Sequence, residues 1–476
     1  MSKSQLWTAD TAKNWIDEHL ESAKKKYSQS NLPQQISFRK LCADWDWAQR
    51  SDVYTHSIHS YPAKLLAYIP IAFLTSSLSS EADNILDPFA GTGTVLLESL
   101  VHKYHPLNSL GVELNPIARL IAKVKTTPLN VEEVEIFVKK LGKIIRATEN
   151  PTIPDFQNRD FWFRKSAQRQ LASIRCGIEN LNAPPSIKDF FWVCFSAIIR
   201  DMSRADPFIA PPVLFNALKF KGDRRSEINE IVRKKNRYNA LTLFNKKVSN
   251  NIERMRTLTK AIGVTNKIRS KIIWDDVRDI KQGICDTLGH INKTNSKSLD
   301  NSIDLIISSP PYIAAQKYIR TTKLELSWLG LATDSQIKKL DRQLIGSEKI
   351  DAGNLKELKE VKNATADKLL EKVYAISPLR AQIASNYYNN MRDAINSMHK
   401  VLRPKARCIL VVGNNTVSGI PAMNHLILSD IANEKRKFST ELILRDNIRS
   451  HGMITKRHET SGMIDDEYIL VMRKNS

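Results

Sequence analysis

Residues 84–99 read NILDPFAGTGTVLLES, a short apolar run that stops at Asp87 and Pro88, passes two closely spaced glycines and continues into a helical pattern. Short apolar runs that end at turn residues and alternate with amphipathic stretches are typical of buried strands in a parallel sheet. Glycines directly after such a strand let the backbone approach a ligand and leave the amides of the next helix free to face it. The stretch therefore predicts a strand, a ligand-binding turn and a helix, in that order.

Further apolar runs of this kind follow along the chain, separated by helical patterns. They cover residues 109–114, 271–276, 303–308, 406–413 and 467–472. Strands that alternate with helices favour a parallel sheet covered on both faces. We therefore expect an α/β fold with a doubly wound, Rossmann-like sheet.

The same pattern divides the chain into six segments. About 150 residues of mainly helical pattern separate Pro116 from Ser270, which is too long for a single crossover and indicates an inserted helical region. A later polar segment is either a mobile loop over the site or a plain surface excursion. The expected segments are an N-terminal helical region (1–50), the first part of the core with the glycine turn (51–125), the inserted helical and basic region (126–270), the second part of the core (271–330), the polar segment (331–375) and the C-terminal strands of the core (376–476).

Composition excludes several classes of protein. The chain has 476 residues with 42% hydrophobic and 26% charged residues, which is ordinary for a soluble globular protein. We find no apolar run of about 18 residues and no signal-peptide pattern, so we expect a cytoplasmic protein without a membrane segment. The five cysteines are scattered without metal-ligand or disulfide spacing, and we expect reduced thiols and no metal site.

The net charge of +22 indicates a polyanionic partner. Much of this charge is local, because residues 219–271 contain 16 lysines and arginines but only 4 acidic residues. A solvated helix face usually mixes both signs of charge. The excess favours contact with nucleic acid over a merely soluble surface.

The glycine turn is of a kind that suits a nucleoside cofactor. A dinucleotide site prefers G-x-G-x-x-G, but position 96 is a leucine, and the G-x-x-x-x-G-K pattern of a phosphate loop is absent. Glu113 follows Gly93 by 20 residues, the spacing at which an acid accepts from both ribose hydroxyls. Asp276 ends the third strand, where a carboxylate can accept from an adenine amino group. With Asp87, these acids are expected along the carboxyl edge of three neighbouring strands.

A second motif, SSPPY at residues 308–312, ends the strand at 303–308. Read together with DPFAGTGT, this motif resembles the amino-group DNA methyltransferases that use S-adenosylmethionine, the family of site-specific cytosine-N4 and adenine-N6 enzymes. The segments HSIHSYPAKLLAYIP (56–70), GVELNP, WDDVRD and LRPKARCILVVGNN resemble further motifs of that family in the same order, so the resemblance covers most of the chain. It implies a seven-stranded sheet that ends in a hairpin of ELILRD and EYILVMRK.

The resemblance also implies the roles of individual residues. It implies S-adenosylmethionine as cofactor, with binding residues Tyr61, Pro62, Lys64, Asp87, Pro88, Phe89, Gly91, Gly93, Thr94, Glu113, Asn115, Asp276 and Val277. It implies a catalytic loop of Ser309, Pro310, Pro311 and Tyr312.

The chemistry of amine methylation explains why this loop has its composition. An exocyclic amine of cytosine or adenine is a poor nucleophile, because its lone pair is delocalised into the ring. The Ser309 hydroxyl and the Pro310 carbonyl can each accept one N–H of the amine. Two consecutive prolines fix the backbone that aims this carbonyl, and Tyr312 offers a ring face to a base taken out of the duplex. Methylation at cytosine C5 instead needs a thiolate, typically after a proline, and no cysteine here follows a proline.

Within the family, serine before Pro-Pro-Tyr looks most like the cytosine-N4 enzymes, although adenine-N6 enzymes with serine also exist. We therefore expect transfer to cytosine N4 in duplex DNA, for restriction-modification or phage defence. The alternatives are adenine N6, an amine of RNA, and a non-catalytic nucleic-acid-binding protein; a nicotinamide-dependent oxidoreductase is the weakest rival. The expected partners are double-stranded DNA and a restriction endonuclease or defence subunit, in a bacterial or archaeal cytoplasm at the nucleoid.

Target recognition is expected in the inserted region, whose basic side chains can neutralise phosphates and read base edges. The family's common orders place this region elsewhere, whereas only 33 residues separate Asp276 from Ser309 here. The candidate contacts with nucleic acid are Arg224, Arg225, Arg233, Lys234, Lys235, Arg237, Lys246, Lys247, Arg320 and Lys323.

Overall fold

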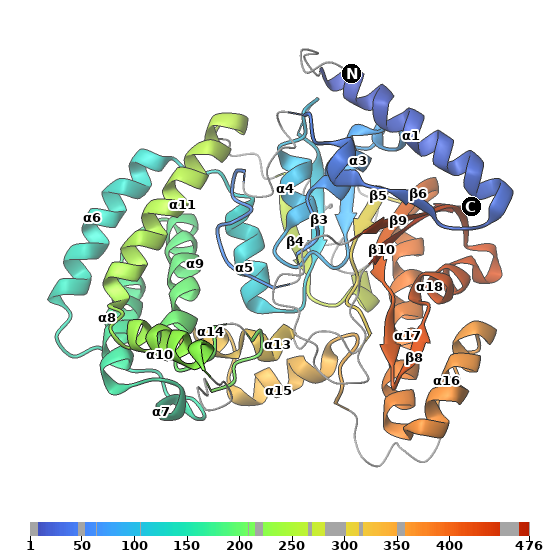
Figure 1. The fold of residues 1–476 in the computed structure, drawn as a ribbon. Coiled ribbons are helices and arrows are strands. Elements are labelled where there is room, and N and C mark those ends of the chain that lie inside the picture. The colour runs from blue at the N-terminus through green and yellow to red at the C-terminus, as the bar shows by residue number, and fades with distance from the viewer. Residues whose placement is uncertain are drawn as a thin grey trace.

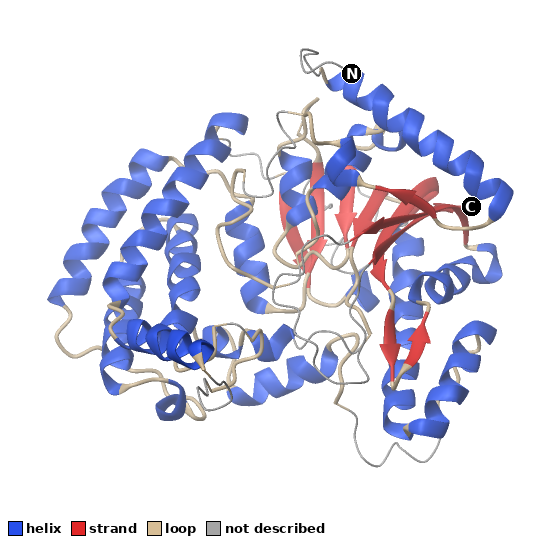
Figure 2. Cartoon of the chain, in the orientation of Figure 1, coloured by secondary structure: helices blue, strands red, loops and turns tan. Residues whose placement is uncertain are grey.

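The computed structural model describes residues 8–45, 53–62, 64–104, 106–207, 209–214, 222–264, 269–280, 301–313, 318–349, 358–447 and 466–475, without the side chain of Arg224. Its centre is an eight-stranded, mostly parallel sheet with the strand order β1-β9-β10-β6-β5-β2-β3-β4 (Figure 2). These strands are β1 (Gln34–Ile36), β2 (Asn84–Asp87), β3 (Asn108–Val112), β4 (Ser270–Trp274), β5 (Ile303–Ser308), β6 (Leu402–Gly413), β9 (Phe438–Asn447) and β10 (Asp466–Lys474). A separate small ribbon pairs β7 (Asn415–Val417) with β8 (Ile420–Ala422).

The order of the strands reverses between β2 and β5. The chain passes outward from β2 through β3 to β4 and then returns to place β5 on the other side of β2. All of these neighbours pair in parallel, so their carboxyl ends meet at one edge of the sheet. In open α/β sheets ligands bind at such a reversal.

The antiparallel end of the sheet differs from expectation by one strand. β10 pairs antiparallel with both β9 and β6, which confirms the hairpin of the last two strands. The sheet has eight strands and not seven, because β1 adds in parallel to β9 with Gln34 opposite Leu444. The region 1–50 was expected to be a helical region, and no strand was predicted in it. The three residues of β1 carry no alternating apolar pattern, and pairing with β9 holds them as a strand.

Helices cover both faces of the sheet. On one face α1 (Ala9–Ser30), α3 (Tyr68–Thr75) and α4 (Thr94–Leu100) pack against side chains such as Ile85, Leu305 and Val411. On the other face α16 (Ala364–Ile376), α17 (Pro378–Val401) and α18 (Asn424–Asn433) pack against Leu86 and Ile306. Neighbouring residues of one strand thus enter different cores, as the alternation of side chains along a strand requires.

A third apolar core lies among the helices that follow β3. Figure 1 shows α6, α8, α9 and α11 together at the end of the molecule away from the β9–β10 hairpin. α5 joins this group to the sheet, because it packs on α9 and on β4. The helices of this part are α5 (Pro116–Lys125), α6 (Val131–Ala147), α7 (Arg159–Trp162), α8 (Lys165–Asn180), α9 (Pro185–Met202), α10 (Asp223–Asn236) and α11 (Ala240–Ile262).

The described part of the polar segment 331–375 contains helices. It contains α15 (Asp334–Gln343) and most of α16, and Thr333 begins α15 with a reciprocal capping box. The remaining short helices are α2 (Phe38–Leu41), α13 (Tyr318–Thr321) and α14 (Lys323–Trp328), with 3₁₀ turns η1 (Ser77–Ser79), η3 (Val277–Asp279) and η5 (Glu434–Arg436).

Two expectations drawn from composition can be compared with the structure only over the described residues. None of their helices combines the length and the apolar character that a membrane crossing requires. Four of the five cysteines lie in the described part, and all four are free thiols; Cys285 lies outside it.

Candidate active site at the carboxyl edge of the sheet

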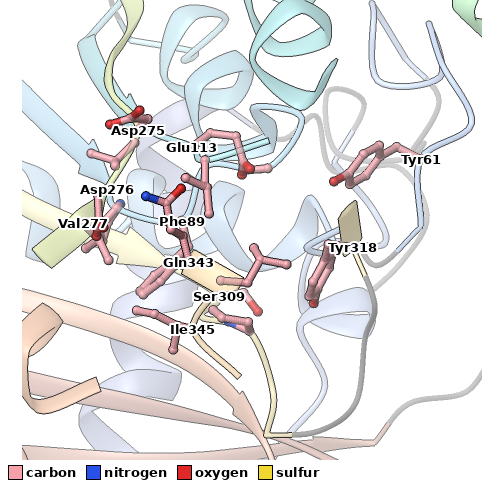
Figure 3. A pocket seen from close by; sticks show the side chains of 16 residues that line it. Tyr61, Phe89, Glu113, Asp275, Asp276, Val277, Ser309, Tyr318, Gln343 and Ile345 are labelled. Atoms are coloured by element: carbon pink, nitrogen blue, oxygen red, sulfur yellow. The ribbon is translucent and has the colours of Figure 1, made fainter. Parts of the chain in front are cut away.

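A cleft of about 720 Å³, partly open to solvent, lies at the carboxyl edge where the order of the strands reverses. Its lining residues are Tyr61, Pro88, Phe89, Gly91, Val112, Glu113, Leu114, Asp275, Asp276, Val277, Ser309, Pro311, Tyr318, Gln343, Leu344 and Ile345. Figure 3 shows Asp275, Asp276 and Val277 at one end, Tyr61 and Tyr318 at the other, and Phe89, Glu113 and Ser309 between them. The mixture of apolar walls with few polar groups is typical of a small-molecule site.

The glycine turn forms one wall of the cleft. Gly91 and Gly93 have φ values of +51° and +76°, a conformation that glycine adopts at little cost. A Cβ on Gly93 would lie 3.1 Å from the Cβ of Ala122, so the turn also packs tightly on α5. Gly91 lines the cleft, whereas Gly93 and the helix residue Thr94 do not.

Asp87 joins the glycine turn to the loop that follows β5. Its Oδ1 accepts a hydrogen bond of 2.5 Å from the Ser308 hydroxyl and one of 3.1 Å from the Phe89 amide. The same amide also donates to the Ser308 hydroxyl over 3.2 Å. Burial raises the pKa of Asp87 to about 7, although the hydrogen bond from Ser308 opposes this rise. Asp87 does not line the cleft. Its hydrogen bonds hold the glycine turn and the loop after β5 together.

Glu113 places a carboxylate in the middle of the cleft. Its two oxygens accept from the amides of Gly91 and Asn115, over 2.9 and 2.7 Å. Burial raises the pKa of Glu113 to about 7, with these amides opposing the shift. Each oxygen retains a further lone pair, so the side chain can accept from hydroxyl groups of a ligand.

Asp276 lines the cleft next to Val277, but its carboxylate is engaged by Arg278. Burial alone would raise the pKa of Asp276, but the hydrogen bonds from Arg278 outweigh it and lower the pKa. The neighbouring Asp275 also lines the cleft, and its nearest cation is Arg119 at 3.8 Å.

The Ser-Pro-Pro-Tyr loop, which follows the strand next to that of the glycine turn, forms another part of the cleft wall. The Ser309 hydroxyl can donate to the Val411 carbonyl over 3.2 Å, and its oxygen has lone pairs that can accept from a ligand. Ser309 and Pro311 line the cleft, whereas Pro310 is buried. The Tyr312 hydroxyl donates to Glu467 of β10 over 3.2 Å and does not line the cleft.

The segment before the glycine turn contributes Tyr61, whose hydroxyl accepts from Asn115 Nδ2 over 3.1 Å. Asn115 Nδ2 also donates to Thr322, which follows α13, so one buried amide joins three parts of the site. Lys64 and Pro62 do not line the cleft. The Lys64 ammonium donates to the carbonyls of His56 and His59, over 3.1 and 2.7 Å, and holds this segment in shape.

Several lining residues were not predicted from the sequence as cofactor contacts. They are Val112, Leu114, Asp275, Tyr318, Gln343, Leu344 and Ile345. The acidic pair at 275–276 is a signal that can point to Asp275, and Tyr318 follows the catalytic loop by only six residues. Residues 343–345 lie at the end of α15, in a segment without a recognisable motif.

The basic side chains predicted to contact nucleic acid fall into two groups. Lys235 donates to the carbonyls of Arg200 and Ala205, and Lys234 pairs with Glu230 at 2.8 Å. Arg320 donates to Asp341 over 3.1 Å, and the Lys323 ammonium lies 4.5 Å from the centre of the Trp162 ring. Like Lys234, the side chains of Arg225, Arg233, Arg237 and Lys246 are exposed, and Lys247 is partly exposed. The side chain of Arg224 lies outside the described part.

Comparison with known proteins identifies similar methyltransferases. The chain is 24% identical over 399 residues to the Type II methyltransferase M.MvaI of Kocuria varians, which covers 79% of this chain and 80% of that protein. It is 23% identical over 287 residues to the Type II methyltransferase M.BsoBI of Geobacillus stearothermophilus, which covers 59% and 53%. A shorter match, 29% identical over 114 residues, covers 22% of the chain and 21% of the Type II methyltransferase M.MjaII of Methanocaldococcus jannaschii. No family model matches the chain.

These relatives support a DNA methyltransferase in a restriction-modification context, with S-adenosylmethionine as the methyl donor. The residues of the cleft fit such a donor. They offer a carboxylate at Glu113 for hydroxyl groups and apolar side chains at Phe89, Val277 and Ile345 for a ring.

Proposed function

We propose that this chain is a site-specific methyltransferase that modifies the exocyclic N4 of cytosine in duplex DNA, as the modification partner of a restriction or phage-defence system. The observation that carries the proposal is that the glycine turn and the Ser-Pro-Pro-Tyr loop follow adjacent strands and line one cleft. The hydrogen bond between Ser308 and Asp87 fastens the two loops to each other. The fold we propose is the doubly wound, Rossmann-like methyltransferase sheet.

The cofactor residues in this proposal follow the order of side chains along the cleft. Glu113 accepts from the ribose hydroxyls, as a carboxylate at the end of a second strand does in nucleoside sites. Asp276 and Val277 lie at the adenine end and Tyr61 at the opposite, methionine end. When bound, S-adenosylmethionine supplies an activated methyl group on its sulfonium.

The chain's own contribution to the reaction is to hold the amine. The Ser309 oxygen accepts one N–H, and its own proton can be donated to Val411. The Pro310 carbonyl accepts the other N–H, and the two prolines keep that carbonyl in place. An amine held by two acceptors points its nitrogen lone pair toward the cofactor, and positioning of this kind can supply much of the rate enhancement. Tyr312, fixed by Glu467, is proposed as the ring on which the everted base stacks.

Cytosine N4 is preferred over adenine N6 because serine, and not aspartate or asparagine, precedes the two prolines. A hydroxyl oxygen is a neutral acceptor. The resemblance to cytosine-N4 enzymes rests on this residue, and adenine N6 remains the second candidate.

The proposed DNA surface lies beside the catalytic loop. α10 and α14 both pack on α9, and α14 follows the catalytic loop in the chain. Arg164 and Arg204 add to this surface. Burial lowers the pKa of the Arg164 guanidinium, and repulsion by Arg204 lowers it further. Neighbouring cations of this kind favour a phosphate backbone as partner.

The experiment that tests the function is mass spectrometry of nucleosides from the DNA of a host that expresses the protein. N4-methylcytosine supports the proposal, whereas N6-methyladenine moves the target to adenine. Purified protein with labelled S-adenosylmethionine should methylate duplex DNA and not transfer RNA. Tight cofactor binding with no transfer to any nucleic acid would indicate a non-catalytic protein.

A further inference from the structure

Arg278 connects three parts of the chain behind the cofactor cleft. It lies in η3, two residues after Asp276. Its Nε and one terminal nitrogen donate to the Asp276 carboxylate, and the terminal nitrogen does so over 2.6 Å. The other terminal nitrogen donates to Asn390 Oδ1 of α17 over 2.9 Å. The nitrogen that meets Asp276 also donates to the Gln343 carbonyl over 3.0 Å. The guanidinium thus joins the end of β4 to α15 and α17.

The contact with Gln343 matters because of where this residue lies. Gln343 is the last residue of α15, and the final carbonyls of a helix lack partners within the helix. A cation at this end satisfies such a carbonyl and complements the helix dipole. Gln343, Leu344 and Ile345 together line the cleft. Arg278 therefore fastens a wall of the cleft that also packs on the apolar cores through Leu344 and Ile345.

Asp276 completes this arrangement. Its oxygens accept from the Arg278 amide and from the guanidinium in four hydrogen bonds between 2.6 and 3.2 Å. A carboxylate has about four acceptor positions, so Arg278 occupies most of its capacity. Both side chains are more than two-thirds buried, which limits screening by solvent. The pair is a fixed part of the wall and not a surface ion pair.

We propose that Arg278 is a positioning residue of the cofactor site: it clamps the wall of residues 343–345 against the adenosine end of the cleft, and cofactor affinity depends on this clamp. The inference rests on the proposed function insofar as the ligand is S-adenosylmethionine. The clamp also reaches toward the catalytic loop, because Asp341 of the same helix accepts from Arg320 of α13, the helix that begins with the cleft residue Tyr318.

The test compares Arg278→Met with the wild-type chain by titration of S-adenosylmethionine. We expect the dissociation constant and the KM for the cofactor to rise about 10-fold, because charge-assisted hydrogen bonds to the wall are lost. The kcat at saturating cofactor should stay within about threefold, since the acceptors for the amine are untouched. Arg278→Lys keeps the charge without the planar fork and should lie between the two.

Arg256→Met is the matched control. Arg256 also pairs with several carboxylates, Glu132, Glu135 and Glu253, but it lies on α11 in the helical region away from the cleft. We expect the Arg256→Met variant to bind S-adenosylmethionine with the affinity of the wild-type chain. Thermal melts of all variants establish that each is folded.

Hydrogen exchange of the free protein gives a readout that needs no cofactor. Amides at the end of α15 should exchange faster in Arg278→Met than in the wild-type chain. In Arg256→Met they should exchange at the wild-type rate. If Arg278→Met binds the cofactor as the wild-type chain does and its α15 exchange is unaltered, the clamp does not exist. If the wild-type chain itself fails to bind S-adenosylmethionine, the proposed function fails, while the exchange experiment still decides for or against the clamp.

Discussion

The hydroxyl of Ser308 donates a hydrogen bond of 2.5 Å to Oδ1 of Asp87, across 221 residues of sequence. Ser308 ends β5 and Asp87 ends the adjacent β2. The bond therefore joins the carboxyl ends of these two strands, where the strand order reverses. Both residues are buried, and neither lines the cleft. Their bond holds the two loops that do.

Ser308→Ala removes this bond and should destabilise the protein by about 1–3 kcal/mol, the usual contribution of a buried hydrogen bond to a carboxyl group. Oδ1 of Asp87 then keeps only the hydrogen bond from the Phe89 amide. The loss should be larger at pH 8 than at pH 6. The bond lowers the pKa of Asp87, so the variant carries a carboxyl with a pKa above the present value of about 7. A carboxyl with a raised pKa in the folded state holds a proton that the unfolded chain releases, so stability falls as pH rises. Denaturant unfolding at both pH values measures this, and an equal loss at both would contradict it.

Ser309→Ala removes an acceptor that lies in the cleft, in contrast to Ser308. If Ser309 holds the amine, methyl transfer should fall by about 100-fold or more, the size seen when a group that acts in the transition state is removed. Cofactor affinity should change by less than about threefold, because Ser309 is not assigned to cofactor binding. Single-turnover rates with duplex DNA and cofactor titration separate the two quantities. Small, equal changes in both would remove Ser309 from the proposed role.

Glu325 of α14 provides a test of pH dependence away from the catalytic groups. Its side chain is 6% exposed, and its Oε2 has no hydrogen-bond partner in the described structure. Burial raises its pKa to about 7. Between its ordinary value of 4.5 and about 7, the folded state keeps a proton that the unfolded state releases, so the wild-type chain loses stability as pH rises through this window.

Glu325→Gln cannot lose that proton. At pH 8 the variant should therefore be more stable than the wild-type chain by up to roughly 3 kcal/mol, and at pH 4 the two should be similar. Free energies of unfolding across this range measure the difference. Parallel pH profiles for the two proteins would show that Glu325 does not titrate in this way.

Two neighbouring basic residues of α10 should behave differently. Arg233 is exposed, whereas Lys235 donates to two backbone carbonyls and burial lowers its pKa to about 8. Arg233→Ala should weaken DNA binding and reduce the salt dependence of the binding constant by about one counterion. Lys235→Met should instead lower the melting temperature, because two carbonyls lose their donor. Binding curves at several salt concentrations, together with thermal melts, distinguish the two; a reduced salt slope for Lys235→Met alone would reverse the assignment.

The strands and the glycine turn were predictable because their signals are local. An apolar run that ends at Asp87-Pro88 and two glycines with positive φ demand a particular backbone whatever surrounds them. The strand β1 was missed for the opposite reason, since its three residues become a strand only by pairing with β9. Among the basic residues, the sequence shows positive charge equally at Arg233 and Lys235 and does not reveal which one packing has buried.

The sequence alone determined that the chain carries a glycine turn, an acid (Glu113) after the next strand and a proline-stiffened loop at the end of a strand, because each of these features is a short run of residues that can be read locally. The tertiary structure decided that β2 and β5 are neighbours, that Lys64 serves the backbone rather than the cleft, and that Arg278 binds Gln343 and Asn390, which lie 65 and 112 residues away. Such contacts depend on how distant segments pack, and spacing along the chain does not encode them.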